Sequence, residues 1–316
     1  CGSFQVNSGA LSQGNLVALV NYMTQMFLAL VVLANLFVIF TKAAASAGRI
    51  EAILKTEPAI TGGTAELSKD KDAVLEMDKV SFGYSEGESA IEQISFTIQP
   101  HQTVGLIGGT GCGKSTIVQL LPRLIDPTAG EIRLGGVPLR EFLLADLRRR
   151  IRIVPQKAVL FSGTIRENLR WGNQDADDAA LWQALTLAQA RDFVEAMPQG
   201  LDTLLVQGGK NCSGGQRQRL CIARALVGRP SLLVLDDSTS ALDYQTDARL
   251  RQSLKKIEGS PAVLIVSQRI ASIRHADFIL VMDQGRLVGQ GTHEELLDSC
   301  AVYQEIVRSQ TREDQR

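Results

Sequence analysis

The N-terminal segment carries the longest apolar pattern in the chain. No Lys, Arg, Asp or Glu occurs before Lys42, and residues 16–40 are mostly apolar. A helix rises about 1.5 Å per residue, so a run of this length can cross a bilayer. Arg49 follows soon after Lys42, and this positive charge predicts that the C-terminal end of the helix faces the cytoplasm. We therefore predict a membrane-spanning helix over residues 15–41.

Two other interpretations of the apolar run are a signal peptide and a buried helix of a soluble domain. A signal peptide carries positive charge before its apolar core, whereas here the positive charge follows it.

The run contains four polar residues, Asn21, Thr24, Gln25 and Asn35. Polar groups facing lipid cost free energy, so we expect these side chains to face other helices or a water-filled cavity. A substrate pathway and ordinary hydrogen bonding between helices both fit this pattern.

Further along the chain, the pattern changes to short apolar runs separated by turn residues. Residues 74–80 and 94–98 are predicted strands. Three other runs are apolar without interruption, at residues 103–107, 232–235 and 262–266. Because helical patterns flank them, we interpret these runs as buried parallel strands of an α/β sheet.

Helical patterns fill much of the chain between and after these strands. Residues 158–228 are rich in helical pattern, most clearly at 181–190 and 216–226. Two short strand patterns meet at residues 283–285, which predicts a hairpin. The sequence Thr-His-Glu-Glu at residues 292–295 is a capping box, and it predicts the start of a last helix.

These patterns divide the chain into four parts. Residues 1–56 hold the predicted membrane helix and its cytoplasmic extension, and residues 57–73 form a linker rich in Gly, Thr and charge. A domain covers residues 74–309, and residues 310–316 form a polar, frayed tail. Because the chain opens on Cys1 within an established pattern, we expect a longer protein whose earlier part holds further membrane helices.

Composition narrows the function classes. The chain has 316 residues and a formal net charge of -1 at pH 7, which gives no reason to expect nucleic acid as a partner. Five cysteines are scattered without a C-x-x-C spacing, at positions 1, 112, 212, 221 and 300. This arrangement predicts neither a disulfide framework nor a zinc site, and it suits a reducing cytosol around the main domain.

A glycine-rich segment links the strand pattern at 103–107 to a helical pattern. It consists of Gly108, Gly109, Thr110, Gly111, Cys112, Gly113, Lys114, Ser115 and Thr116. Strand, G-x-x-x-x-G-K-S and helix in this order form a P-loop, whose glycines let successive backbone N–H groups face phosphate oxygens. The positive end of the helix dipole adds to this field. We predict a bound nucleoside triphosphate, with Lys114 reaching the β- and γ-phosphates and Ser115 offering its hydroxyl to Mg²⁺.

The apolar run at 232–235 ends in two carboxylates, Asp236 and Asp237. In P-loop proteins, the acid that holds Mg²⁺ lies at the end of such a strand, so we assign this role to Asp236. Asp237 stands where a general base for the attacking water is expected. Together with the P-loop, this pair predicts hydrolysis of the nucleotide as well as its binding.

A second glycine-rich segment, Ser213, Gly214, Gly215 and Gln216, opens the helical pattern at 216–226. Bare N–H groups and a hydroxyl at a helix N-terminus form an anion site. One triphosphate does not need two such sites from the same chain. We therefore expect this segment to contact nucleotide held by another copy of the chain or by a partner.

The order of these motifs resembles the ATP-binding-cassette (ABC) transporters, and more narrowly the bacterial exporter half-transporters. In those proteins a last transmembrane helix runs into a C-terminal nucleotide-binding domain. The resemblance rests on the P-loop, Gln156, the segment 213–216, Asp236 and the segment 240–243. It implies a P-loop α/β fold with a parallel-sheet core, an antiparallel β subdomain and a helical subdomain, and it implies ATP and Mg²⁺ as cofactors.

The resemblance also implies roles for individual residues. Tyr84 would stack on adenine, and Gln156 would contact Mg²⁺ and the γ-phosphate and link the domain to the membrane part. Residues 213–216 would bind the γ-phosphate of a nucleotide held by the opposite domain, and Asp243 would act across the dimer interface. The implied partner is a second half-transporter in the cell membrane, with both nucleotide domains in the cytoplasm. The substrate class stays open between small molecules, lipids and peptides.

Two residues of the predicted ATP pocket depart from the family pattern, and two milder departures, Gln207 and Cys212, lie just before the segment 213–216. Asp237 stands where the family usually has Glu, so the carboxylate stops about 1.5 Å short of the water, and errors of about 1 Å can cost about 10²-fold in rate. Gln268 stands where the family usually has His in the switch after the next strand. Gln can donate a hydrogen bond to phosphate, but it does not titrate as His does.

The two departures, beside a near-complete segment at 213–216, resemble one half of a heterodimeric exporter. In such a pair, the P-loop, Asp237 and Gln268 would build a slow ATP site, while Ser213 and its neighbours would complete the competent site of the partner. Two alternatives are an active homodimeric exporter and an ATP-sensing regulatory subunit without transport. A soluble cassette ATPase is disfavoured by the apolar run at 16–40.

Overall fold

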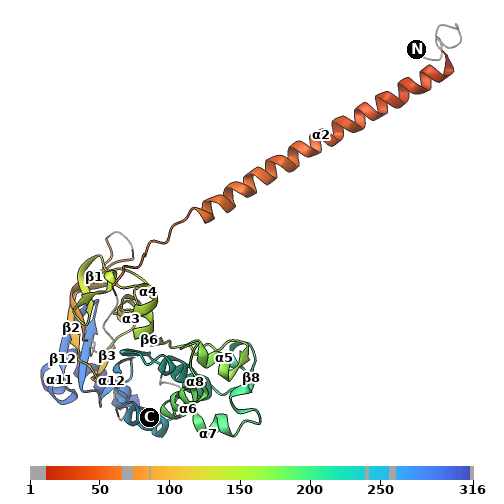
Figure 1. Cartoon of the computed structure of the whole chain (residues 1–316). Helices are drawn as coiled ribbons and strands as arrows, with labels where there is room; N and C mark the ends of the chain where they lie inside the picture. Colours follow the sequence, from red (N-terminus) through yellow and green to blue (C-terminus); the bar gives the residue numbers. More distant parts are fainter. Residues whose placement is uncertain (1–11, 66–73, 85–86, 239–241, 256–260, 314–316) are drawn as a thin grey trace. The chain divides into compact units, whose positions relative to one another are not determined.

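A computed structural model describes residues 12–65, 74–84, 87–238, 242–255 and 261–313. The chain divides into two compact units, residues 1–59 and residues 60–316. Each unit is described by itself below. Figure 1 labels the main helices and strands in chain order.

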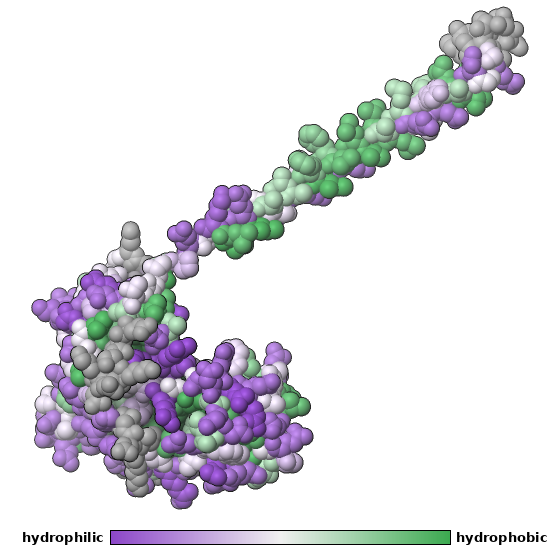
Figure 2. All heavy atoms as spheres, in the orientation of Figure 1, coloured by the Kyte–Doolittle hydropathy of each residue, from purple (hydrophilic) through white to green (hydrophobic). Residues whose placement is uncertain are grey.

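The first unit is built on one helix, α2 (Gln13–Leu54). Its N-terminus is capped by Ser12, whose side chain accepts a hydrogen bond from the backbone N–H of Asn15. None of its side chains is buried, and apolar residues run along it (Figure 2). Within the described residues, α2 is the one helix long and apolar enough to cross a membrane, and the mean hydropathy of an 18-residue window within it is 2.2. The hydroxyl of Thr24 donates to the Val20 carbonyl at 2.9 Å, so this polar side chain is satisfied within its own helix.

The second unit contains a six-stranded sheet with the strand order β12-β11-β3-β10-β9-β6. Five of these strands are parallel, and β12 pairs antiparallel with β11 at one edge. The strands are β3 (Thr103–Gly108), β6 (Ile151–Val154), β9 (Leu232–Asp236), β10 (Ala262–Ser267), β11 (Phe278–Asp283) and β12 (Arg286–Gly291). The predicted parallel sheet and the predicted terminal hairpin are confirmed.

Alternate residues of the parallel strands pack on opposite faces of this sheet, because side chains alternate along a strand. In β9, Leu233 belongs to a buried cluster that also holds Leu220 and Tyr303, which we call the α8 cluster. Val234 belongs to a second buried cluster that also holds Ile117, which we call the α3 cluster. Burial on both faces explains why these strands are continuous apolar runs in the sequence.

A second, antiparallel sheet has the strand order β2-β1-β4-β5. Its strands are β1 (Leu75–Phe82), β2 (Ile91–Ile98), β4 (Ala129–Leu134) and β5 (Val137–Pro138). Buried residues of this sheet, such as Val80 and Ile94, join the α3 cluster. The sequence predicted β1 and β2 but not β4 and β5, because β4 is short and its first residues, Ala129 and Gly130, are exposed and give no alternating pattern.

A helical region follows β6 and is joined by a small β7-β8 sheet. Its elements are β7 (Gly163–Thr164), α5 (Ile165–Arg170), α6 (Asp178–Leu187), α7 (Arg191–Glu195), β8 (Leu204–Leu205) and α8 (Gly214–Val227). Two short 3₁₀ helices lie between α7 and α8, at Gly200–Asp202 and Gln207–Gly209. Figure 1 shows α5 to α8 gathered on one side of this unit. The helix-rich region predicted for residues 158–228 is confirmed.

The remaining helices flank the two sheets. They are α3 (Lys114–Leu120), a 3₁₀ helix (Leu139–Glu141), α4 (Leu144–Arg150), α9 (Tyr244–Lys255), α10 (Ile270–Ile273), α11 (His293–Ser299) and α12 (Ala301–Glu313). The predicted capping box at the start of α11 is present between Thr292 and Glu295. Helix α12 includes Gln310, a residue that the sequence pattern assigned to a polar tail.

Residues 61–65, at the start of the second unit, are hydrogen-bonded to later parts of it. The backbone N–H of Gly63 donates to the Phe142 carbonyl at 2.8 Å. The buried Arg123 donates to the Thr61 carbonyl at 2.9 Å, and its guanidinium also pairs with the Asp126 carboxylate. These bonds hold residues 61 and 63 of the predicted linker on the domain.

Candidate active site

The carboxyl ends of three adjacent parallel strands meet at one edge of the six-stranded sheet. The glycine-rich segment leaves from the end of β3, Asp236 ends β9 and Ser267 ends β10. The strand register places Ser267 opposite Ile107 and Asp236 opposite Val266. Ligands of open α/β sheets bind at this edge, so the strand order brings together motifs that lie far apart in the sequence.

Lys114 is folded onto its own loop. Its ammonium donates to the carbonyl oxygens of Gly108 and Gly109 at 2.8 and 2.6 Å, and it lies 3.5 Å from the Cys112 sulfur. Gly113 precedes α3 with a φ of 98°, a left-handed conformation that favours glycine. The loop therefore presents a buried cation at the N-terminus of a helix, where anions are stabilised.

Two neighbouring glycines of the loop have different surroundings. A Cβ built on Gly108 would collide with the carbonyl oxygen of Met282 and lie 2.6 Å from the Cys112 sulfur. A Cβ built on Gly109 would meet nothing within 4 Å. Gly108 is therefore required for packing against β11, whereas Gly109 lines an open cradle above the loop.

Asp237 is hydrogen-bonded through both of its carboxylate oxygens. Gln156 Nε2 donates to Oδ2 at 3.2 Å, and the Ser267 hydroxyl donates to Oδ1 at 3.3 Å. Asp237 has a φ of 45°, and its N–H donates to the Val266 carbonyl at 2.7 Å. Asp tolerates this left-handed conformation because its short side chain hydrogen-bonds locally. The sequence did not reveal that Gln156 and Ser267 share this carboxylate.

Burial raises the pKa of Asp236, and the neighbouring Asp237 raises it further, while Lys114 opposes the shift. A nearby cation would stabilise the ionised form of a carboxylate in these surroundings. Ser115 is exposed on the loop, and Gln156 is exposed beyond β6. A carboxylate, a hydroxyl and an amide oxygen are hard donors that suit Mg²⁺. In the described part of the chain, no cluster of three or more His, Cys, Asp or Glu could hold a metal.

The segment 213–216 forms the N-terminus of α8. Ser213 accepts a hydrogen bond from the backbone N–H of Gln216, and the Gln216 side chain accepts one from the N–H of Ser213, so the two residues make a capping box. Gly214 is exposed, and a Cβ there would meet nothing within 4 Å. The capped helix start therefore keeps an open surface beside Gly214.

Residues next to or within the two glycine-rich segments belong to different buried clusters. Cys112, within the first segment, belongs to the α3 cluster. Cys212, directly before the second, belongs to the α8 cluster, and burial raises the pKa of its thiol. Each segment is thus positioned by a different part of the core.

Comparisons with known proteins identify the family to which this nucleotide-binding site is similar. The family described as ABC transporter matches residues 91–240. An uncharacterized ABC transporter ATP-binding protein of Bacillus subtilis, YfiB, is 42% identical over 313 residues, which is 98% of this chain and 54% of that protein. The chain carries an ABC transporter ATP-binding domain and is homologous to ABC exporter half-transporters.

Other relatives of this ABC domain point to the same group. An ATP-dependent lipid A-core flippase of Alcanivorax borkumensis is 40% identical over 263 residues, covering 83% of this chain and 45% of the flippase. The solved structure of a bacterial Atm1-family ABC exporter with ATP bound matches 98% of this chain and 55% of that exporter, with a TM-score of 0.84 and 31% identity. The chain spans about half the length of these proteins. It has their exporter fold, with an apolar N-terminal helix and an α/β nucleotide-binding domain.

Tyr84 of the ABC domain lies beside the start of α3. Its ring is exposed and packs edge-on against Phe82, with the centroids 5.0 Å apart. Its hydroxyl lies 3.3 Å from the Thr116 hydroxyl. The aromatic face is therefore presented next to the P-loop helix, where the sequence predicted an adenine platform. Ser85 and Glu86, which follow in the predicted turn, lie outside the described residues.

Asp243 begins helix α9. Its carboxylate accepts hydrogen bonds from the Thr246 backbone N–H at 2.9 Å and from the Thr246 hydroxyl at 2.7 Å. These bonds, led by that of the Thr246 side chain, lower the pKa of Asp243. Ser240 and Ala241, which belong to the same predicted motif, lie outside the described residues. Asp243 is thus held as an exposed, ionised group at the helix start.

Gln268 follows β10 at the same sheet edge as Asp236, and its side chain is exposed. Its backbone carbonyl accepts a hydrogen bond from Gln310 Nε2 at 2.6 Å. The sequence gave no sign of this contact, because Gln310 lies 42 positions further along the chain and belongs to a segment without a motif.

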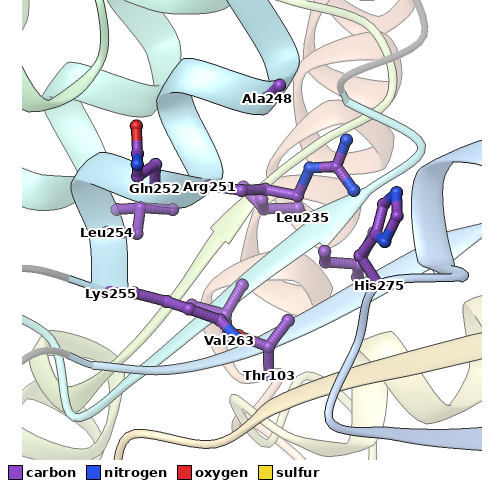
Figure 3. A pocket seen from close by; sticks show the side chains of 10 residues that line it. Thr103, Leu235, Ala248, Arg251, Gln252, Leu254, Lys255, Val263 and His275 are labelled. Carbon is purple, nitrogen blue, oxygen red and sulfur yellow. The ribbon is translucent and has the colours of Figure 1, made fainter. Parts of the chain in front are cut away.

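A cavity of about 270 Å³ lies between α9 and the six-stranded sheet, where Figure 3 shows its lining side chains. Most of its wall is formed by apolar residues, among them Leu235, Leu254, Val263 and Ile265. The cations on its rim are paired, Arg251 with Asp247 and Lys255 with Asp277, each at 2.8 Å. Apolar walls and paired charges do not suit a triphosphate, so we assign this cavity no part in nucleotide binding.

Proposed function

We propose that this chain is the ATP-binding subunit of an ABC exporter that couples ATP hydrolysis at a dimer of nucleotide domains to substrate export. The long apolar helix α2, the P-loop domain that follows it and the exporter relatives support this proposal. Under it, the full-length protein is a multi-pass protein of the cell membrane, and its nucleotide domain lies in the cytoplasm.

The residues that would hold ATP and Mg²⁺ follow from the site. The P-loop amides and Lys114 would bind the phosphates, and Tyr84 would stack on adenine. Mg²⁺ would be held by Ser115, Gln156 and Asp236, and when bound it would neutralise charge on the phosphates. The cradle beside Gly109 and the raised pKa of Asp236 support this assignment.

Asp237 is the proposed general base. In hydrolysis, the water oxygen forms a bond to the γ-phosphorus, the bond from that phosphorus to ADP breaks, and the water proton passes to the Asp237 carboxylate. Gln156 and Ser267 orient that carboxylate through its two oxygens. Gln268 would donate a hydrogen bond to the γ-phosphate from its side-chain amide.

We propose that hydrolysis at this site is slow. Asp237 has a short side chain that Gln156 and Ser267 hold through its two oxygens, so it does not extend toward the water as a Glu side chain would. Gln268 supplies no titratable group. These two features support a degenerate site in a heterodimer, in which the partner holds the competent site.

The segment 213–216 is proposed to serve the nucleotide of the partner domain. The observation that carries this proposal is that Cys112 and Cys212 belong to two separate buried clusters. It supports a P-loop and a segment 213–216 that act on different nucleotides. The open surface at Gly214 supports the same assignment, since a neighbouring domain can approach it. Asp243 would contact the same partner.

The deciding experiment is the steady-state ATPase rate of the full-length protein, purified alone and then with a candidate partner. Near-zero activity alone and robust activity together are expected for the asymmetric pair. Robust activity alone would mean an active homodimer and would end the degenerate-site proposal. ATP binding without substrate-stimulated hydrolysis or transport in liposomes, with any partner, would instead mean a sensing subunit.

The substrate class is best tested with lipids first. The flippase relative of Alcanivorax borkumensis acts, by its name, on lipid A-core, and flipping of a labelled lipid in liposomes is a direct assay. Small molecules and peptides are the next classes to test in the same liposomes.

A further inference from the structure

We infer that Gln310, on helix α12, is a positioning residue for the switch formed by residues 267–270. The inference rests on the proposed role of Gln268 at the γ-phosphate. It adds that the C-terminal helix sets the backbone from which Gln268 reaches the nucleotide.

The contact is made by one side chain to two backbone groups of the switch. Gln310 Nε2 donates to the Gln268 carbonyl at 2.6 Å, and Gln310 Oε1 accepts from the Ile270 N–H at 2.9 Å. A primary amide that donates to one peptide unit and accepts from another fixes the separation and orientation of both. The backbone on either side of Arg269 is therefore clamped.

This clamp replaces a cap that helix α10 does not have. The residue before α10 is Arg269, whose side chain makes no capping hydrogen bond. The first N–H of α10 belongs to Ile270, and Gln310 accepts it. Unsatisfied N–H groups at a helix start are costly unless a partner is supplied. The C-terminal helix supplies that partner from 40 positions away.

The other side of the switch is held by the catalytic carboxylate. Ser267 accepts a hydrogen bond from the Arg269 N–H at 3.0 Å and donates to Asp237 at 3.3 Å. Between these contacts and the Gln310 clamp, the backbone that carries the exposed Gln268 side chain is fixed from both ends.

Helix α12 is itself anchored, so the clamp has a rigid base. Tyr303 is fully buried, and its hydroxyl lies 2.7 Å from His293 Nδ1 on α11. Ile306 and Val307 pack against the α8 cluster, as does Ile270 of the switch helix. Gln310 follows one turn later. A displacement of α12 would thus shift the switch directly.

The consequence is a specific loss in nucleotide selectivity. Adenine, ribose and the first two phosphates are bound by groups that Gln310 does not touch. Gln268 would contact the γ-phosphate and no other part of the nucleotide. Loss of the clamp is therefore expected to weaken binding of ATP analogues and to leave binding of ADP unchanged.

The test compares three variants of the full-length protein in nanodiscs. Gln310→Ala removes the clamp. Gln310→Glu keeps an acceptor for Ile270 but places an oxygen opposite the Gln268 carbonyl. Gln304→Ala is the matched control, since Gln304 lies on the same helix and donates to the Leu297 carbonyl at 2.8 Å, away from the switch.

Two readouts are measured for each variant, the dissociation constants of AMP-PNP and ADP with Mg²⁺, and amide hydrogen exchange over residues 267–273. For Gln310→Ala we expect faster exchange in this segment and an AMP-PNP affinity about 5-fold weaker, the size of one lost hydrogen bond. ADP affinity should change less than about 2-fold on the same scale. Gln310→Glu should weaken AMP-PNP binding at least as much as Gln310→Ala does. Gln304→Ala should match the wild type in both readouts.

Unchanged exchange in Gln310→Ala would overturn the inference, because the clamp would then not hold the switch. Equal losses of AMP-PNP and ADP affinity would overturn it too, because a general loss of structure would explain them. A wild-type protein that binds ATP but never hydrolyses it would contradict the proposed ATPase and leave these binding readouts intact, so the two failures are distinguishable.

Discussion

Gln156 Nε2 donates a hydrogen bond to Asp237 Oδ2 at 3.2 Å, although the two residues lie 81 positions apart in the chain. The link exists because β6 and β9 are neighbours in the sheet, with Val154 opposite Leu235. Gln156 and Asp237 each lie two positions after this pair and therefore reach the same edge. A substitution at either residue is expected to change the position of the other side chain.

The first prediction concerns the length of the Asp237 side chain. Asp237→Glu adds one methylene, which brings the carboxylate closer to the attacking water, and we expect own-site hydrolysis to rise about 10-fold or more. The measurement is single-turnover ATP hydrolysis by the full-length protein, with Asp237→Asn as a matched variant that keeps the length and removes the base. A rate that falls in Asp237→Glu would contradict the assigned role.

The second prediction concerns the charge of Asp236. Its folded-state pKa is raised, chiefly by burial, so the folded state favours the protonated form. Stability from this group is therefore full at low pH and is lost as pH rises from the unfolded pKa through the folded pKa. At neutral pH we expect Asp236→Asn to raise the melting temperature of the nucleotide-free protein.

The same variant should lose stabilisation by Mg²⁺ and ATP together. For the wild type, a ligand at about 100 times its Kd adds about 2.7 kcal/mol, and this gain should depend on Mg²⁺. Thermal melting with ATP, with and without Mg²⁺, checks both parts. A Mg²⁺-dependent gain that survives in Asp236→Asn would show that another residue holds the ion.

The third prediction separates two adjacent glycines. Gly108→Ala would drive a methyl group into the Met282 carbonyl, and we expect a loss of about 1–3 kcal/mol in unfolding free energy from overpacking. Gly109→Ala places its methyl group in open space and should leave the unfolding free energy within about 0.5 kcal/mol of the wild type. Chemical denaturation measures the unfolding free energy of both variants. Similar losses of unfolding free energy in the two would contradict the packing described for Gly108.

The fourth prediction concerns the segment that serves the partner. Gly214→Asp puts a negative charge on an open surface, so the fold should be preserved while ATP on the partner is repelled. We expect the ATPase rate of the assembled transporter to fall at least 10-fold, roughly the effect of about 1.4 kcal/mol, and binding of ATP to this chain to remain.

A companion variant, Ser213→Ala, removes a helix cap and is expected to cost about 1 kcal/mol of stability. Thr292→Ala removes an equivalent capping box from α11 and controls for that loss. If Ser213→Ala with Gly214→Asp kept full ATPase activity in the assembled transporter, the assignment of this segment to the partner site would be wrong.

Much of the site could be predicted because its chemistry is local in sequence. The P-loop needs glycines, Lys114 and Ser115 within one turn between a strand and a helix, so nine consecutive residues identify it. The parallel strands β3, β9 and β10 are buried on both faces and are therefore uninterrupted apolar runs. The strands β4 and β5 were missed, since a short strand with an exposed start has no such pattern.

The sequence by itself determined the predicted phosphate-binding groups, which acid ends which strand, and that a long apolar helix precedes the domain. Only the tertiary structure decided that Asp237 is shared by Gln156 and Ser267, that Cys112 and Cys212 belong to different buried clusters, and that Gln310 contacts the backbone of residues 268 and 270. Periodicity and motif spacing report on neighbours within a few residues. Contacts across 30 to 81 positions are set instead by the order of the strands and by which helix covers which face, and these emerge only when the core packs.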